Sequence, residues 1–301
     1  MSDPQRIVVA GATGNLGGRI VKALRERGAH AVALTRKQSS PAQVDQLRSL
    51  GAEIVVVDSW TAPALASACD GARCVVSALL GMRDVMVEAQ TVLLEGAVQA
   101  GVPRFIPSDY ALDFNQLEPG ENRNLDWHRE FQERLEKAPI TATSILNGMF
   151  MDLLLGNAPF ILFKWNRVLY WENADQVLEF TAMDDVAKVT AAAALDAQAP
   201  RFVHVAGDRL TARQLAEVAS EVLGRKFKPQ WAGTVGTLNI MIRVLRKLMP
   251  AKDDPFPPWQ GMQYSRSMFG GVGLVGTADV GRYSEITWTK VRDMLAASAP
   301  R

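Results

Sequence analysis

Three glycines near the start of the chain are spaced as in sites that bind phosphate groups. Gly11, Gly14 and Gly17 form the pattern G-x-x-G-x-x-G directly after the apolar run of residues 6–10. Gly11 permits a tight turn, Gly14 lets the backbone approach a pyrophosphate, and Gly17 allows a following helix to pack closely. A helix start also offers unpaired N–H groups and a positive dipole end. The pattern therefore predicts a dinucleotide site, with the phosphates nearest to Thr13, Gly14, Asn15 and Leu16.

Two basic residues indicate which dinucleotide is bound. An NAD site expects an acidic residue about 20 positions further on, where it accepts a hydrogen bond from the ribose 2′-hydroxyl. Here the apolar run of residues 31–35 is followed by Arg36 and Lys37 instead. Because two cations suit a 2′-phosphate, the sequence favours NADP(H). The alternative is that both residues belong to an ordinary solvated loop.

Hydride transfer with a nicotinamide also needs a group that gives a proton to the substrate. The pair Tyr-x-x-x-Lys, which many short-chain dehydrogenases use, does not occur after any of the four tyrosines. His128 is a candidate donor because imidazole titrates near neutrality. Tyr110 is the other candidate because it follows a predicted strand end, where ligands bind. For both residues, packing without a chemical role is the alternative interpretation.

Two segments of the second half could meet other molecules. Residues 259–273, WQGMQYSRSMFGGVG, are rich in glycine and aromatic residues, and predict a loop in which Tyr264 contacts the substrate as part of a lid. A loop packed on its own lobe is the alternative. Residues 238–249 predict a basic amphipathic helix, which either faces the core or seeks a partner or membrane surface. The interpretation as a core-facing helix is preferred.

The elements that must position these residues alternate between strand and helix. Helical patterns include residues 84–100 and 124–137, and a helix opening at Ser40 with Gln43 in a capping box. Apolar runs, typical of strands buried on both faces, predict strands at residues 6–10, 31–35, 53–58 and 74–80. Residues 104–109 and 141–146 are predicted as a fifth and a sixth strand. Right-handed crossovers between such strands give an α/β fold with a Rossmann-type, doubly wound parallel sheet.

The alternation becomes irregular after about residue 150. We therefore expect an NADP(H)-binding Rossmann domain over residues 1–150 and a smaller, mixed substrate lobe over residues 151–301. Parts of residues 175–205 are expected to return to the Rossmann sheet. Thr211 and Gln214 predict the cap of a further helix.

Composition excludes several classes of partner and site. The chain of 301 residues has 33 Lys+Arg and 32 Asp+Glu, so no extended field attracts nucleic acid. No uncharged run reaches the roughly 18 apolar residues of a membrane span, and no secretory signal is visible, which predicts a cytoplasmic protein. Cys69, Cys74 and three histidines do not supply a convincing zinc site. No metal is expected.

Longer stretches of the chain resemble a known family. They are VVAGATGNLGGRIVKAL, RFIPSDYALDF, TSILNGMFMD, FTAMDDVAKVTAAAAL and HVAGDRLTARQLAEVASEVLG. Together they are similar to the NmrA-like and isoflavone-reductase-like atypical short-chain dehydrogenases, over most of the chain to about residue 225. The resemblance implies a Rossmann lobe that binds NADP(H) and a second lobe that shapes a cleft. It also implies cofactor contacts from the glycine turn, the basic pair and three strand ends, namely Ser77, Ala78, Leu79, Pro107, Ser108, Asn147, Gly148, Met149 and Phe150.

One departure from that family bears on the chemistry. Its reductases carry a lysine on the helix between strands five and six, where this chain has His128 or a neighbour and no lysine from Arg104 until Lys137. The leading hypothesis is an NADP(H)-dependent reductase of a small, mostly apolar carbonyl or unsaturated substrate, with His128 or Tyr110 at the substrate oxygen. The missing Tyr-x-x-x-Lys pair and the missing lysine motivate an alternative, a noncatalytic NADP(H)-binding redox sensor that contacts a regulatory protein. A third hypothesis is an isomerase or epimerase that retains its cofactor and shows no net redox change.

Overall fold

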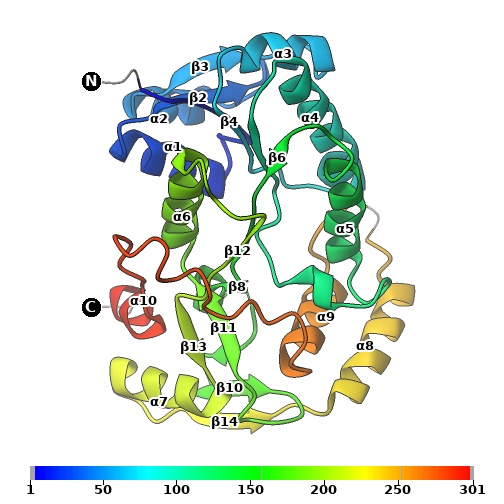
Figure 1. Ribbon diagram of the computed structural model, residues 1–301. Helices are drawn as coiled ribbons and strands as arrows, with labels where there is room; N and C mark the ends of the chain where they lie inside the picture. Colours follow the sequence, from blue (N-terminus) through cyan, green and yellow to red (C-terminus); the bar gives the residue numbers. More distant parts are fainter. Residues whose placement is uncertain (1–3, 157, 252, 299–301) are drawn as a thin grey trace. The chain divides into compact units, whose positions relative to one another are not determined.

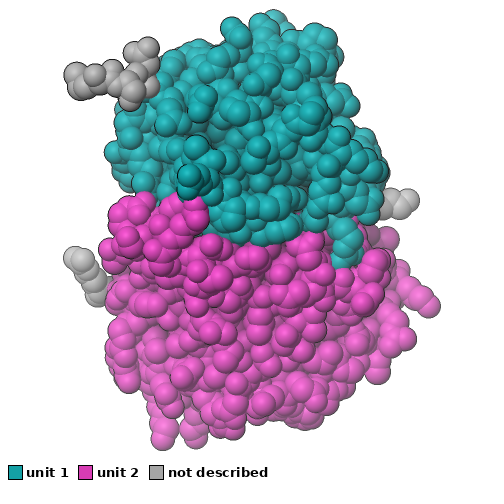
Figure 2. Space-filling model, viewed as in Figure 1, with its two compact units in different colours: residues 1–110, 127–145, 183–203 teal, residues 111–126, 146–182, 204–301 magenta. Residues whose placement is uncertain are grey.

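The computed structural model describes residues 4–156, 158–251 and 253–298, which form two compact units (Figures 1 and 2). Unit 1 comprises residues 1–110, 127–145 and 183–203, and unit 2 comprises residues 111–126, 146–182 and 204–301. One crossing between the units, at residues 145 and 146, lies close to the boundary expected near residue 150. Residues 183–203, from the segment expected to return to the Rossmann sheet, group with unit 1.

Unit 1 is built on a six-stranded parallel sheet with the order β3-β2-β1-β4-β5-β6 (Figure 1). All five pairings are parallel. The strands are β1 (Arg6–Ala10), β2 (His30–Thr35), β3 (Glu53–Val56), β4 (Cys74–Ser77), β5 (Arg104–Ile106) and β6 (Thr141–Ala142). The helices are α1 (Asn15–Glu26), α2 (Pro41–Ser49), α3 (Ala62–Cys69), α4 (Gln90–Gln99), α5 (Arg123–Leu135, in unit 1 from residue 127) and α6 (Met183–Leu195). The predicted doubly wound α/β fold is confirmed.

Alternate strand residues bury opposite faces of this sheet, as the pleat requires. Val8 pairs in register with Val32 on β2 and Val75 on β4, and all three are fully buried. Apolar residues of α3, α4 and α5 cover this face and join the same core cluster. Helices α1 and α6 pack on each other, and α6 also contacts β4 and β5. Both faces are therefore covered, which explains the unbroken apolar strand sequences.

Two predicted helix starts in unit 1 differ from the structure. The helix expected over residues 84–100 begins as a π-helix, η1 (Asp84–Ala89), and continues as α4. The capping box predicted at Ser40 is wrong, since the Ser40 side chain caps no N–H group. Gln43 instead donates from Nε2 to the Thr13 carbonyl oxygen at 3.1 Å. The glutamine that looked like part of a cap thus holds the glycine turn.

Unit 2 contains two small sheets, β14-β10-β9 and β13-β11-β8. Their strands are β8 (Met149–Phe150), β9 (Ile161–Leu162), β10 (Arg167–Tyr170), β11 (Leu178–Thr181), β13 (Asp208–Leu210) and β14 (Lys228–Trp231). Strand β7 (Ser144–Leu146) pairs with β12 (Phe202–His204). The helical elements of this unit are η2 (Phe114–Gln116), η3 (Met151–Leu155), α7 (Ala212–Leu223), α8 (Val235–Leu248), α9 (Pro258–Phe269) and α10 (Val291–Ser298). The capping box at Thr211 and Gln214 is confirmed.

The loop predicted over residues 259–273 is wrong for most of its length, because helix α9 occupies Pro258–Phe269. A proline in its first turn favours a helix start. Trp259, Gln263 and Ser267 then recur every four residues and are buried on one face. The glycines that suggested a loop mainly end the helix, at Gly270 and Gly271. Among the described residues, no helix combines the length and apolar character needed to cross a membrane.

Candidate nucleotide site and a buried polar chain

A cavity of about 560 Å³ opens in unit 1 beyond the carboxyl ends of its parallel strands. Gly11 follows β1, and Leu79 follows β4, so the cavity includes the point where the strand order reverses. Ligands of doubly wound folds bind at this point. The lining residues are Gly11, Thr13, Leu34, Thr35, Arg36, Gln38, Ser39, Val57, Asp58, Trp60 and Leu79.

The glycine turn has the geometry of a phosphate-binding turn. Gly11 has φ of 76°, and a Cβ there would overlap the Ala78 carbonyl oxygen on the neighbouring strand. A Cβ at Gly17 would overlap the Gly11 carbonyl oxygen. Gly14 precedes the first residue of α1, and no side chain caps this helix start. The α1 N-terminus is therefore open to an anion, and the turn fits a pyrophosphate.

The two residues of the basic pair behave differently. Arg36 lines the cavity, and its guanidinium carbon lies 5.8 Å from the centre of the Trp60 ring. The Lys37 amine pairs with the Asp58 carboxylate at 2.9 Å, with both side chains largely exposed. Arg36 is thus the cation that the structure places at the cavity. The positive charge of Lys37 is offset by Asp58.

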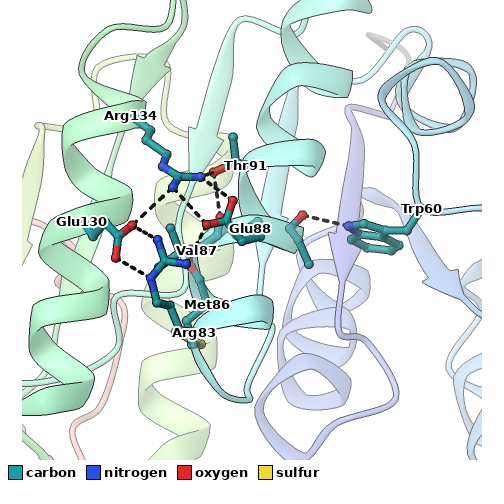
Figure 3. Close-up of polar contacts among 10 residues, drawn as sticks. Trp60, Arg83, Met86, Val87, Glu88, Thr91, Glu130 and Arg134 are labelled. Atoms are coloured by element: carbon teal, nitrogen blue, oxygen red, sulfur yellow. Dashed lines mark hydrogen bonds and ion pairs between the residues drawn. The ribbon is translucent and has the colours of Figure 1, made fainter.

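Several lining residues were not predicted from the sequence, including Gln38, Ser39, Asp58 and Trp60. They follow the ends of β2 and β3 along the chain. Their place at the cavity could have been predicted from the sequence, because the carboxyl ends of neighbouring parallel strands meet at one edge of the sheet. The Trp60 indole donates from Nε1 to the Ala89 carbonyl oxygen at 2.8 Å, which fixes this part of the wall to the end of η1 (Figure 3).

The ends of β4 and β5 are joined by buried hydrogen bonds. Ser108 donates from Oγ to the Leu79 carbonyl oxygen at 2.8 Å, and its backbone N–H donates to Gln90 Oε1 at 2.8 Å. Of the predicted contacts in residues 77–79, Leu79 lines the cavity, and Ala78 packs against Gly11. The Ser77 hydroxyl is buried without a hydrogen-bond partner among the described residues. Pro107 is buried next to Ser108.

A chain of buried polar side chains begins one residue after Ser108. The Asp109 carboxylate meets His128 Nδ1 at 3.2 Å through Oδ1, and it accepts a hydrogen bond from Ser144 Oγ at 2.7 Å through Oδ2. Arg201 in turn donates from Nη1 to Ser144 Oγ at 2.7 Å. Asp109 and Ser144 are fully buried, and His128 is 8% exposed. Both carboxylate oxygens of Asp109 thus have partners, and one of these contacts holds the His128 ring at Nδ1.

Ion pairs fix the helix that carries His128 (Figure 3). Arg134 and Glu130 on α5 face Arg83, directly before η1, and Glu88, near the end of η1. Arg134 binds Glu88 at 2.8 Å and Glu130 at 3.2 Å, while Arg83 binds Glu88 at 2.8 Å and also pairs with Glu130. Hydrogen bonds from Arg134 lower the pKa of Glu88. Glu130 lies two residues after His128, so this network restrains the part of α5 next to the polar chain.

Tyr110, the other predicted proton donor, is enclosed in unit 1. It is 8% exposed, and burial raises the pKa of its hydroxyl well above the usual value. Neither Tyr110 nor His128, which is also 8% exposed, lines the cavity described above. The two cysteines are also buried, and burial raises the pKa of each thiol to about 12. Neither thiol is therefore a reactive nucleophile at neutral pH.

The remaining predicted contacts, Asn147–Phe150 and Tyr264, belong to unit 2. The Asn147 carbonyl oxygen accepts a hydrogen bond from Thr181 Oγ1 at 2.7 Å. Gly148 has φ of 66° and lies close to the Glu179 backbone. Tyr264 is on α9, and burial raises the pKa of its hydroxyl. Contacts of these residues with cofactor or substrate stay predictions.

Comparison with known proteins identifies the family of the chain and solved structures with the same fold. Residues 3–253 match the family model of the NmrA-like family. Oxidoreductase swnN of Metarhizium robertsii is 26% identical over 257 residues, which cover 74% of this chain and 74% of that protein. The solved structure of AtPrR2 with NADP+ and (+)-pinoresinol has a TM-score of 0.81 and 22% identity, and the match covers 99% of both chains. An isoflavone reductase structure has a TM-score of 0.82 and 18% identity, over 98% of this chain and 100% of that chain.

Proposed function

Because the chain belongs to the NmrA-like family, as its sequence resemblance indicated, we propose that it is an NADP(H)-dependent reductase of a small carbonyl or unsaturated compound. The observation that carries this proposal is the cavity at the strand-order reversal, which brings the glycine turn and Arg36 together. A pyrophosphate and a 2′-phosphate are the anionic groups that these two features suit.

The lining residues have distinct roles in this proposal. The open N-terminus of α1 binds the pyrophosphate, with Gly11 and Gly17 keeping the backbone accessible. Arg36 pairs with the 2′-phosphate, and Trp60 offers a flat apolar wall to the adenine end. Asn147–Phe150 and Tyr264 are proposed to line the nicotinamide and substrate ends. Lys37 contributes less than Arg36 because Asp58 neutralises it.

His128 is the proposed proton donor. NADPH, when bound, would supply the hydride and with it the two electrons that reduction of the substrate requires. Reduction is completed by one proton, which the His128 imidazole would give to the substrate. The contact between Nδ1 of that ring and the Asp109 carboxylate would hold the ring in one orientation. Tyr110 is a weaker acid at neutral pH because burial raises its pKa.

The proposal is tested by binding and turnover in the same samples. Calorimetry with NADPH, NADP+, NADH and NAD+ is followed by the loss of NADPH absorbance with aldehydes, quinones, enones and pinoresinol. We expect binding that favours the phosphorylated cofactors, together with turnover of at least one compound. Failure to bind any of the four dinucleotides would overturn the proposal. Tight binding without turnover of any substrate would instead favour the noncatalytic redox sensor.

A further inference from the structure

Helix α8 has apolar side chains on two opposite faces. Leu238 and Ile242 are buried, and the helix packs against α9. Ile240, Val244 and Leu248 are instead 57%, 48% and 72% exposed. The sequence favoured a helix whose apolar residues face the core, and this interpretation holds for only one side of α8. Of the twelve exposed large hydrophobic residues among the described ones, five lie on α8 or directly after it, namely Ile240, Met241, Val244, Leu248 and Met249.

Three of these exposed residues form a stripe along α8, and positively charged side chains lie beside it. Ile240, Val244 and Leu248 recur every four residues, so they lie on the same side of the helix. Arg243 and Lys247 are exposed beside this stripe. Helix α8 itself, which is described over its whole length, contains no acidic residue to offset these cations. The outer surface of α8 is therefore both apolar and cationic.

We propose that this outer surface of α8 docks the protein on an anionic phospholipid bilayer. Ile240, Val244 and Leu248 would enter the boundary between headgroups and acyl chains, while Arg243 and Lys247 stay at the level of the lipid phosphates. An amphipathic helix binds a bilayer surface through these two contributions. The inference concerns unit 2 alone and does not depend on the proposed reductase activity.

The dimensions of α8 favour a bilayer over a second copy of the chain. Its 14 residues make a helix about 21 Å long, so a stripe about 10 Å wide covers only about 200 Å². A stable protein interface buries about 800 Å² on each partner. The stripe is also too short to span a membrane, which takes about 20 apolar residues. Surface docking needs neither a large matched partner nor a spanning length.

The test is flotation of the full-length protein with two kinds of vesicle. One kind contains phosphatidylcholine alone, and the other an equal mixture of phosphatidylcholine and phosphatidylglycerol. We expect the protein to float mainly with the mixed vesicles, and less so as salt is raised. The double variant Arg243→Gln, Lys247→Gln should bind the mixed vesicles about 25-fold more weakly. Leu248→Ser should weaken binding about tenfold.

Matched variants elsewhere separate this surface from general effects of charge and apolar exposure. Arg73→Gln with Lys137→Gln removes the same net charge from two exposed cations of unit 1. Leu155→Ser removes another exposed leucine, which is 41% exposed and lies in η3 of unit 2. Both controls should float as the unchanged protein does. Circular dichroism checks that each variant is folded.

Three outcomes would overturn the proposal. Equal flotation with both kinds of vesicle would remove the role of anionic lipid. Equal losses in the α8 variants and their controls would show that α8 is not the docking surface. Absence of flotation, together with a dimer that Leu248→Ser dissociates in sedimentation, would show that a second copy covers α8. Flotation with the mixed vesicles that is lost only in the α8 variants would support the proposal.

Discussion

The glycine turn after β1 and the polar chain after β5 follow two strands of the same parallel sheet, but they are built differently. The turn consists of backbone within residues 11–17, and its shape depends on the absence of side chains at Gly11 and Gly17. The polar chain consists of side chains from four separate segments, at Asp109, His128, Ser144 and Arg201. One region is a local structure, whereas the other exists only in the folded unit.

This difference indicates a division of roles within the proposed reductase. An exposed backbone turn can bind an anion without any ionisable side chain. A buried carboxylate with two partners can hold an imidazole in one orientation, which proton transfer requires. Substitutions in the turn should therefore reduce cofactor binding, and substitutions in the polar chain should reduce turnover while cofactor binding is retained. The predictions below test this separation.

The largest effect is expected for Gly11→Ala. The new Cβ would overlap the Ala78 backbone, and the residue would keep a left-handed conformation, so the free energy of unfolding should fall by about 4 kcal/mol. NADPH binding should be lost in calorimetry. Gly28→Ala is the matched control, because Gly28 has φ of 77° with nothing within 4 Å of its Cβ position. It should cost about 1 kcal/mol and leave binding intact. Equal costs at both glycines would contradict the proposed close approach at Gly11.

The next effect is expected for His128→Gln. It should lower kcat about a hundredfold, or about 2.7 kcal/mol, and leave the Kd for NADPH unchanged, because it removes the proton donor and not the turn. Asp109→Asn should cause much of the same loss and change the pH profile of kcat. His30→Gln is the control, since His30 is half-buried and pairs with Glu53 at 2.8 Å. An unchanged kcat in His128→Gln would remove this residue from the chemistry.

Ser144→Ala tests how much the hydrogen bonds within the polar chain contribute to the free energy of unfolding. It leaves Asp109 Oδ2 and Arg201 Nη1 without the hydroxyl that joins them, so the free energy of unfolding should fall by about 2 kcal/mol. Denaturant unfolding provides the measurement. Ser49→Ala is the control, because the exposed Ser49 hydroxyl donates only to the nearby Gln46 carbonyl oxygen. A Ser144→Ala variant as stable as the control would mean that these buried contacts contribute no net stability.

Arg36→Ala tests how the cavity selects its dinucleotide. It should weaken NADPH binding about tenfold, or about 1.4 kcal/mol, and leave NADH binding almost unchanged, because only NADPH carries the 2′-phosphate. Lys37→Ala should have a smaller effect, since Lys37 pairs with Asp58. Calorimetry with both cofactors supplies the comparison. Equal losses for NADPH and NADH would show that Arg36 does not recognise the 2′-phosphate.

The fold could be predicted largely because its signals are local. Five of the six strands of unit 1 coincide with predicted strands, and the cap at Thr211 and Gln214 depends on residues three apart. The sixth prediction, residues 141–146, is wrong in extent, because the structure divides this segment into β6 and β7. Predictions from local patterns were wrong where a side chain interacts with residues that are distant in the sequence. Gln43 binds the Thr13 carbonyl oxygen instead of completing a cap at Ser40, and residues 259–269 form a helix whose buried face lies within unit 2.

The residues of the candidate site likewise include some that local patterns predicted and others that only the folded structure shows. Gly11, Thr13 and Arg36 were predicted from the glycine pattern and the basic pair, Leu79 was implied by the family resemblance, and all four line the cavity. Trp60 was missed although it follows the end of β3, and its hydrogen bond to Ala89, 29 residues further on, is visible only in the folded unit. The partners of Asp109 lie on β7 and in α5, far along the chain. Only tertiary packing shows that these side chains meet.

His204 gives the smallest expected effect and shows whether a histidine beside a carboxylate is sufficient for chemistry. Its Nε2 lies 3.8 Å from Asp113 and its Nδ1 lies 3.9 Å from Asp279, with its side chain 28% exposed. A hydrogen bond to Asp113, and then the charges of Asp113, Asp279 and Glu179, raise the pKa of His204. The contacts are longer than the one between His128 and Asp109, and they lie in unit 2.

A raised pKa in the folded state means that the protonated His204 stabilises the fold. This contribution is fully present below the unfolded pKa of about 6.5 and is lost as the pH rises through the higher folded value. His204→Gln should therefore lower the free energy of unfolding by less than about 1 kcal/mol in mild acid and by almost nothing in mild alkali. Denaturant unfolding on both sides of neutrality measures the difference, and kcat should not change. Loss of kcat in His204→Gln would show that the short, buried contact of His128 is not what distinguishes the proposed proton donor.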